Sequence, residues 1–125
     1  MKYRTRKMVA AKDLNSNGSL FGGRVLAWID EEAFIFVACQ LDSSSVVTRS
    51  ISEVEFVSTA RQGDLIEVGT ETVTLGRTSI TVRCAVRNRR TGQIITRVER
   101  IVFVHVDASG QPVPHGRQAP RSITA

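Results

Sequence analysis

One continuous apolar segment, residues 22–41 of a 125-residue chain, most constrains the fold. Its length and composition predict a single α-helix, with hydrophobic residues all the way around the axis. The residues that leave no broad polar face are Val25, Leu26, Trp28, Ile29, Phe34, Ile35, Phe36 and Val37. A helix of this kind is normally surrounded by the rest of its domain. Its β-branched and aromatic residues are modest helix formers, so burial must stabilise it.

Strand patterns dominate the rest of the chain. Most of these segments are rich in β-branched residues, and the one that begins at Ile80 alternates cleanly between apolar and polar side chains. The predicted strands are 3–9, which is weak, and 45–57, 65–75, 80–87 and 94–106. Short turns at residues 63–64 and 88–92 join successive strands. One long helix followed by such strands predicts an α+β fold, with an antiparallel β-sheet wrapped around a central helix.

The chain length fits one domain, which we place at residues 1–110. The tail, residues 111–125, holds all three prolines and lacks periodicity, so we expect it to be loosely packed. The basic N-terminus is not followed by the apolar region of a signal peptide. The apolar run 34–39 is too short to cross a bilayer. We therefore expect a cytoplasmic protein that has no membrane partner.

Charge and cysteine usage narrow the function classes. The net charge is +5 and the pI about 10.0, which suits a phosphate-bearing substrate as well as nucleic acid. The arginines are dispersed with little aromatic interleaving, which argues against a nucleic-acid partner. Cys39 and Cys84 lie in apolar runs without metal-ligand spacing, so we interpret both as reduced core thiols.

The start of the predicted helix combines groups that suit acyl chemistry. Gly22 and Gly23 offer bare backbone N–H groups to an oxyanion or carbonyl oxygen. Asp30 lies two turns further along, and its neighbours around the helix are Gly23, Leu26, Ala33, Phe34 and Val37. A carboxylate on that face must be compensated or catalytic. The alternative is one solvated acidic patch formed with Glu31 and Glu32.

Residues 17–30 read Asn-Gly-x-x-Phe-Gly-Gly, then six residues and Asp, and this pattern resembles the acyl-CoA thioesterases of the hotdog fold. The resemblance is to the small single-domain bacterial acyl-CoA hydrolases in particular. It continues through residues 47–48, 55–57, 63–64, 76–79 and 106–112, so it covers nearly the whole chain. Related phenylacetyl-CoA-type thioesterases carry His at the position of Phe21, whereas the small hydrolases carry Phe. The resemblance implies a hotdog fold.

The resemblance also implies hydrolysis of acyl-CoA to a carboxylic acid and CoA. Asp30 falls on the position of the catalytic carboxylate, as a general base on water or as a nucleophile on the thioester carbonyl. The amide of Gly23, beside Gly22, would polarise the thioester oxygen. Asn17 would orient the water or the thioester, although it could equally be a turn residue before Gly18. The glycine pair could also be no more than a flexible helix start.

Further residues are candidates for contact with the substrate. Phe21 cannot donate a hydrogen bond to the acyl group as a His could, and Thr48 could reach the acyl end, although threonine is ordinary in a strand. Arg77, Thr78 and Ser79 combine a guanidinium with two hydroxyls, which suits a phosphate of CoA. Arg61 has a weaker claim to the same role. An exposed turn without a ligand is the alternative for residues 77–79.

No metal or organic cofactor is expected, since CoA enters as part of the substrate. His105 and His115 have no Ser or Cys partner at recognisable spacing, so a nucleophilic triad and a metal site are unsupported. Two alternatives stay open: a hotdog protein that binds acyl-CoA without hydrolysing it, and a hotdog dehydratase of hydroxyacyl thioesters. Dehydratases typically use a His with a carboxylate, and neither histidine is near the helix start.

We also expect self-association. A sheet of this kind leaves unpaired edge strands, and a chain of this size has a limited core. In the family that this sequence resembles, the site forms between protomers, with the helix carboxylate of one facing the Gly-Gly amide of the other. The prediction is therefore at least a homodimer, which assembles further into a tetramer or hexamer.

Overall fold

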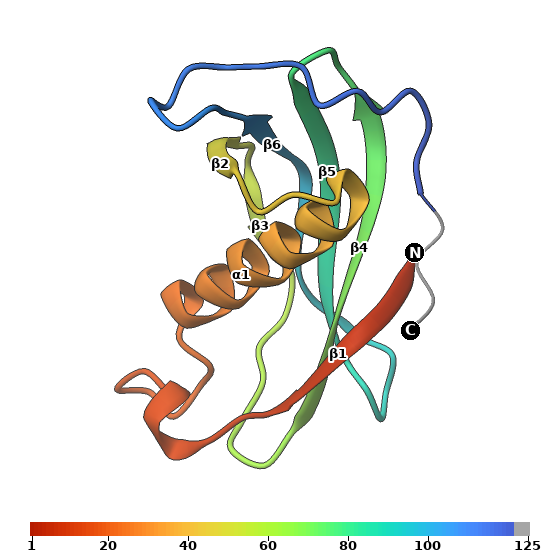
Figure 1. The fold of residues 1–125 in the computed structure, drawn as a ribbon. Helices are drawn as coiled ribbons and strands as arrows, with labels where there is room; N and C mark the ends of the chain where they lie inside the picture. The colour runs from red at the N-terminus through yellow and green to blue at the C-terminus, as the bar shows by residue number, and fades with distance from the viewer. Residues whose placement is uncertain (122–125) are drawn as a thin grey trace.

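A 20-residue helix, α1 (Gly22–Leu41), lies across one face of a six-stranded antiparallel sheet (Figure 1). The computed structural model describes residues 1–121. The strands are β1 (Lys2–Met8), β2 (Val46–Ile51), β3 (Val54–Phe56), β4 (Leu65–Leu75), β5 (Ser79–Asn88) and β6 (Ile94–His105). Their order is β1-β4-β5-β6-β2, and β3 also pairs with β6. The predicted α+β architecture, with an antiparallel sheet and one long helix, is confirmed.

The segment predicted as one strand at 45–57 forms two short strands instead. Both pair with β6, and the regular register is interrupted at Ser52 and Glu53, although the N–H of Ser52 still donates to the carbonyl of Arg100 at 2.9 Å. The hydroxyl of Ser52 accepts the backbone N–H of Arg100 at 3.2 Å, and this side-chain bond competes with regular strand pairing. The β-branched composition could not reveal this interruption.

The helix contributes only one side to the core. Val25, Ile29, Ala33 and Val37 are buried against the sheet, whereas Ile35 on another side remains 49% exposed. The expectation that the rest of the domain surrounds the helix is therefore wrong for the single chain, because the sheet covers one side only. The all-round hydrophobic pattern leaves apolar surface outside this core.

The two cysteines differ in environment. Cys84 is buried, and this burial raises the pKa of its thiol to about 11. Cys39 is exposed on α1, so the prediction of a core thiol is wrong for this residue. Within residues 1–121, no helix is long and apolar enough to span a membrane.

The described part of the tail lies against the domain without forming a helix or a strand. The backbone N–H of His115 donates to the carbonyl of Arg77 at 3.2 Å. At 2.7 Å, the N–H of Arg121 donates to Oε1 of Gln40 on α1. Residues 122–125, part of the tail expected to be loosely packed, lie outside the described residues. The domain boundary at residue 110 stays a prediction.

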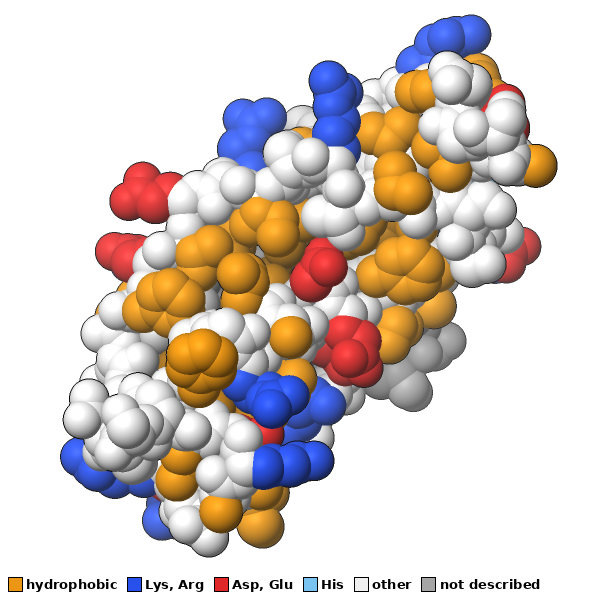
Figure 2. Space-filling model, turned by 90° about the vertical axis from the view of Figure 1, so that its left-hand side faces the viewer, with side chains coloured by type: hydrophobic (Ala, Val, Ile, Leu, Met, Phe, Trp, Pro, Cys, Tyr) orange, Lys and Arg blue, Asp and Glu red, His pale blue; other side chains and the backbone are white. Residues whose placement is uncertain are grey.

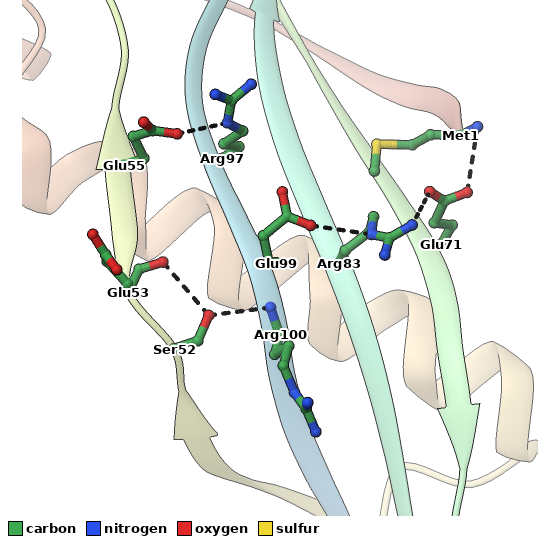
Figure 3. Close-up of polar contacts among 9 residues, drawn as sticks. All are labelled: Met1, Ser52, Glu53, Glu55, Glu71, Arg83, Arg97, Glu99 and Arg100. Carbon is green, nitrogen blue, oxygen red and sulfur yellow. Dashed lines mark hydrogen bonds and ion pairs between the residues drawn. The ribbon is translucent and has the colours of Figure 1, made fainter.

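The sheet face away from α1 carries opposite charges in pairs that cross the strands (Figure 3). Arg97 lies 2.6 Å from Glu55, and Arg83 lies 3.3 Å from Glu71 and 3.5 Å from Glu99. Exposed pairs of this kind each contribute little stability, about 0–1 kcal/mol. They keep this part of the face polar and nearly neutral.

Candidate functional site

Two side chains shape the loop that leads into α1. Buried Asp13 accepts the N–H of Ala10 at 2.9 Å, and its Oδ1 lies 3.4 Å from Nε of Arg24. Asn15 Oδ1 accepts the N–H of Asn17 at 2.9 Å and that of Ser19 at 3.1 Å. Neither role is among those predicted from the sequence, although the tendency of Asp and Asn side chains to bond nearby backbone offers a signal for them. Together they hold Asn17 at an exposed position in the loop.

Gly22 and Gly23 are the first two residues of α1, and an aromatic ring approaches each closely. A Cβ atom at Gly22 would lie 3.2 Å from the ring of Phe56, and one at Gly23 would lie 2.9 Å from the ring of Phe21. First-turn N–H groups have no acceptor inside a helix, and residues 1–121 supply no backbone acceptor to these two. The glycine pair therefore presents open N–H groups beside apolar walls.

Asp30 is half-buried between α1 and β2. Its Oδ1 accepts a hydrogen bond from the hydroxyl of Thr48 at 2.9 Å. Glu32 instead accepts from Thr5 on β1 at 2.6 Å, and Glu31 is exposed. The alternative of one solvated acidic patch is therefore wrong, because the carboxylates of Asp30 and Glu32 contact different strands. The Thr48 bond fixes one oxygen of Asp30, and no residue in the described part of the chain bonds Oδ2.

Asp30 and the Gly23 amide lie too far apart to act on one carbonyl within a single chain. Seven residues of helix separate them by about 10 Å along the axis. The N–H groups of a helix also point toward its N-terminus, away from Asp30. A base and an oxyanion donor must both lie within about 3 Å of the reacting groups. One chain alone does not bring them together.

Apolar side chains gather on the surface around the start of α1 and the strands β2 and β3, with acidic groups among them (Figure 2). Phe21, Val47, Phe56 and Val57 are 46% to 55% exposed. An open cavity of about 430 Å³ lies here, and its lining includes Leu20, Gly22, Val25, Phe56, Ile95 and Thr96. β2 is also an edge strand of the sheet. Exposed apolar patches beside an unpaired edge typically mark an interaction surface.

The candidate phosphate-binding residues lie at opposite ends of the sheet. Arg61 follows Ala60, whose carbonyl accepts the N–H of Leu20 at 2.8 Å, so Arg61 is close to the helix start. Arg77 and Thr78 lie in the turn from β4 to β5, and Ser79 begins β5, where its carbonyl accepts the N–H of Gly76 at 2.9 Å. The length of β4, about 33 Å, separates the two. They cannot bind the same phosphate in one chain.

The histidines lie beyond the other end of α1. Nε2 of His105 is 3.4 Å from Oγ of Ser43, and its Nδ1 is 3.2 Å from the carbonyl oxygen of Val113. Nε2 of His115 is 2.9 Å from the carbonyl oxygen of Ser79. His105 thus has a serine neighbour that a separation of 62 residues concealed in the sequence. Nδ1 of His105 faces the carbonyl of Val113, whereas a Ser-His-Asp triad requires a carboxylate at that position.

Residues 1–121 contain no group of three or more His, Cys, Asp or Glu side chains that could hold a metal ion.

Comparison with known proteins gives consistent matches. The family model of the thioesterase superfamily matches residues 17–95. A protein of Buchnera aphidicola subsp. Baizongia pistaciae, named an uncharacterized acyl-CoA thioester hydrolase, is 32% identical over 90% of this chain and 85% of its own. The crystal structure of an apo-hexameric acyl-CoA thioesterase is 38% identical with a TM-score of 0.79, covering 88% of this chain and 72% of that one.

A third match was solved with ligands. The acyl-CoA hydrolase of Staphylococcus aureus, in complex with butyryl-CoA, CoA and CoA disulfide, is 26% identical with a TM-score of 0.79. The similarity covers 88% of this chain and 66% of that one.

Proposed function

Because this chain belongs to the thioesterase superfamily and has the hotdog fold, we propose that it hydrolyses acyl-CoA thioesters to a carboxylic acid and CoA. The observation that carries the proposal is the placement of Asp30, half-buried on α1 and oriented by the hydroxyl of Thr48. The open N–H groups of Gly22 and Gly23 at the start of the same helix support it further. Relatives named acyl-CoA thioester hydrolases support the choice of substrate.

In the proposed mechanism Asp30 is the general base. Its Oδ2 takes a proton from a water molecule, whose oxygen bonds to the thioester carbonyl carbon. The carbonyl electrons move onto the oxygen, which accepts a hydrogen bond from the N–H of Gly23. When the tetrahedral intermediate collapses, the C–S bond breaks, and the sulfur of CoA receives the proton that Asp30 held. Atoms and charge balance without a further reactant.

We assign positioning roles to the neighbouring side chains. Thr48 orients the carboxylate of Asp30, a role different from the acyl contact expected from the sequence. Asn17, exposed in the loop before α1, orients the water or the thioester. Phe21 and Phe56 provide an apolar wall for the acyl group beside the glycine pair.

The proposed site is shared between two copies of the chain. The separation of about 10 Å between Asp30 and the Gly23 amide supports this, because a partner can supply the missing half. The edge strand β2 and the apolar surface around Phe21, Val47 and Phe56 provide a place for the partner to bind. The hexameric thioesterase with 38% identity supports further assembly, and we propose a hexamer built from dimers.

A panel of acyl-CoAs of different chain lengths and head groups, followed by release of free thiol, tests the proposed activity. We expect hydrolysis of at least one member at a rate well above the spontaneous rate. Binding of acyl-CoA without thiol release from any member would contradict the proposal. That result would favour the alternative of a non-hydrolytic binding protein.

Replacing Arg77 by Ala is expected to raise KM for acyl-CoA by roughly tenfold, the cost of one charge-assisted hydrogen bond to phosphate. The KM for a truncated thioester without the nucleotide should rise much less, because that substrate lacks the phosphate. The matched variant is Arg61→Ala, at the opposite end of the sheet. Steady-state kinetics of both variants on both substrates identify which of the two arginines binds the nucleotide.

An equal rise in KM for the full and the truncated substrate in the Arg77→Ala variant would show that Arg77 supports structure. The phosphate site would then lie elsewhere, with Arg61 as the next candidate.

A further inference from the structure

A cluster of arginines surrounds one buried carboxylate on the sheet face away from α1. Glu67 of β4 is only 4% exposed. Its Oε1 lies 2.8 Å from Nε of Arg87, and its Oε2 lies 3.3 Å from Nε of Arg6 and 3.8 Å from Nε of Arg89. Arg90 follows Arg89 in the turn between β5 and β6 and lines the same groove. Three guanidinium groups thus meet at one carboxylate, and a fourth arginine lines the groove beside them.

This cluster has an excess of positive charge. Burial raises the pKa of Glu67, but hydrogen bonds from Arg87 and Arg6 and the nearby charge of Arg89 outweigh it, so the pKa is lowered. Glu67 is therefore ionised at neutral pH, so its one negative charge lies among three arginines, and Arg90 adds a further positive charge to the groove. In each of the three close pairs Nε is the nearest nitrogen, which leaves the forked terminal nitrogens available to another acceptor. By contrast, Arg97 elsewhere on this face has its own carboxylate, Glu55 (Figure 3).

An aromatic ring forms part of the same groove. The guanidinium carbon of Arg87 lies 3.6 Å from the centroid of the Tyr3 ring, so the two groups stack. Gly69 makes room for this ring, since a Cβ atom there would lie 2.9 Å from a carbon of Tyr3. The groove has a volume of about 600 Å³. It combines a flat stacking surface with a concentration of positive charge.

The turn that carries the outer arginines is held by its own hydrogen bonds. Oδ1 of Asn88 accepts the N–H of Arg90 at 2.9 Å and that of Thr91 at 3.1 Å. At 2.8 Å, the N–H of Arg89 donates to the carbonyl of Leu65 on β4. The backbone of both arginines is thereby fixed before any ligand arrives, which lowers the entropy cost of binding.

We propose that this groove binds a small anion carrying a diphosphate group, either free or as part of a nucleotide. The forked donors of Arg89 and Arg90 would hold the phosphate oxygens, and the Arg87–Tyr3 stack would adjoin a base. Arg6 and Arg87 would keep Glu67 compensated while the outer arginines bind the ligand. The site is separate from Asp30 and from the helix start, and its occupancy does not depend on hydrolysis.

Isothermal titration calorimetry with pyrophosphate and with ADP tests the site. The test variant is Arg89→Ser/Arg90→Ser, which leaves the closest partners of Glu67 in place. The matched control is Arg49→Ser/Arg100→Ser, which removes the same charge from exposed positions that form no ion pair within residues 1–121. Thermal melting of all three proteins checks that the fold is retained.

We expect the test variant to bind at least ~10-fold more weakly than the wild type, and the control to bind nearly as the wild type does. Binding of pyrophosphate would show that the phosphates suffice, and binding of ADP alone would assign the site to a nucleotide. The proposal would be overturned if neither anion binds the wild-type protein at low salt. Equal weakening in both double variants would overturn it as well, because it would reflect net charge alone.

Discussion

Replacing Asp30 by Asn is expected to lower the rate of acyl-CoA hydrolysis at least ~100-fold while the protein stays folded. The amide keeps the shape of the carboxylate, and its oxygen can still accept the hydroxyl of Thr48 at the position of Oδ1. It cannot take a proton from water, so the base is removed and little else changes. The measurement is kcat from thiol release for the wild type and the variant, with circular dichroism and size-exclusion profiles compared.

The neighbouring acid provides a matched control. Glu31 follows Asp30 in α1 and is exposed, so Glu31→Gln removes the same charge from the same turn. We expect this control to retain nearly full activity. Near-normal turnover in a folded Asp30→Asn protein would remove Asp30 from the mechanism, and an equal loss in Glu31→Gln would attribute the effect to local charge.

Much of the fold could be predicted because its elements have clear hydrophobic periodicity and are separated by turn residues. The helix begins at Gly22 and ends at Leu41 as the apolar segment indicates, and β4 runs from Leu65 to Leu75 as predicted. The division of residues 45–57 into two strands could not be predicted, because it depends on a bond from Arg100 to the Ser52 side chain. Pairing between distant segments decides such details.

The candidate site could be predicted in part. The pattern of residues 17–30 predicts Asp30 and the glycine pair as site residues, and the structure shows what surrounds each of them. The bond from Thr48 to Asp30 joins a strand to a helix, so spacing along the chain does not reveal it. The arginines around Glu67 come from β1, β5 and a turn, and only the folded sheet brings them together.

The exposed apolar surface of the single chain could not be predicted from the sequence either. Ile35 belongs to the apolar helix that we expect the domain to surround, yet it is 49% exposed, and Phe56 of β3 is 55% exposed. Hydrophobic side chains favour burial, but the sequence pattern does not indicate whether the same chain or a second chain buries them. Under the proposed assembly, a second copy of the chain buries them.

The second prediction with a large expected effect concerns the site shared between two chains. In a dimer with twofold symmetry, each proposed site takes Asp30 from one protomer and the helix start, with Gly23 and Asn17, from the other. An Asp30→Asn chain and an Asn17→Ala chain are therefore each expected to form inactive homodimers. A mixed dimer holds both changes in one site and none in the other. Asn17 is exposed and its side chain makes no recorded hydrogen bond within residues 1–121, so its replacement should leave the fold intact.

Subunit mixing is thus the most direct test that the site is shared. Equal amounts of the two inactive proteins are exchanged, and mixed dimers are verified by native mass spectrometry before thiol release is measured. Random exchange makes half of the dimers mixed, each with one of two sites intact, so we predict recovery of roughly a quarter of wild-type activity. No recovery after verified exchange, or full activity in a monomer, would contradict a site built from two chains.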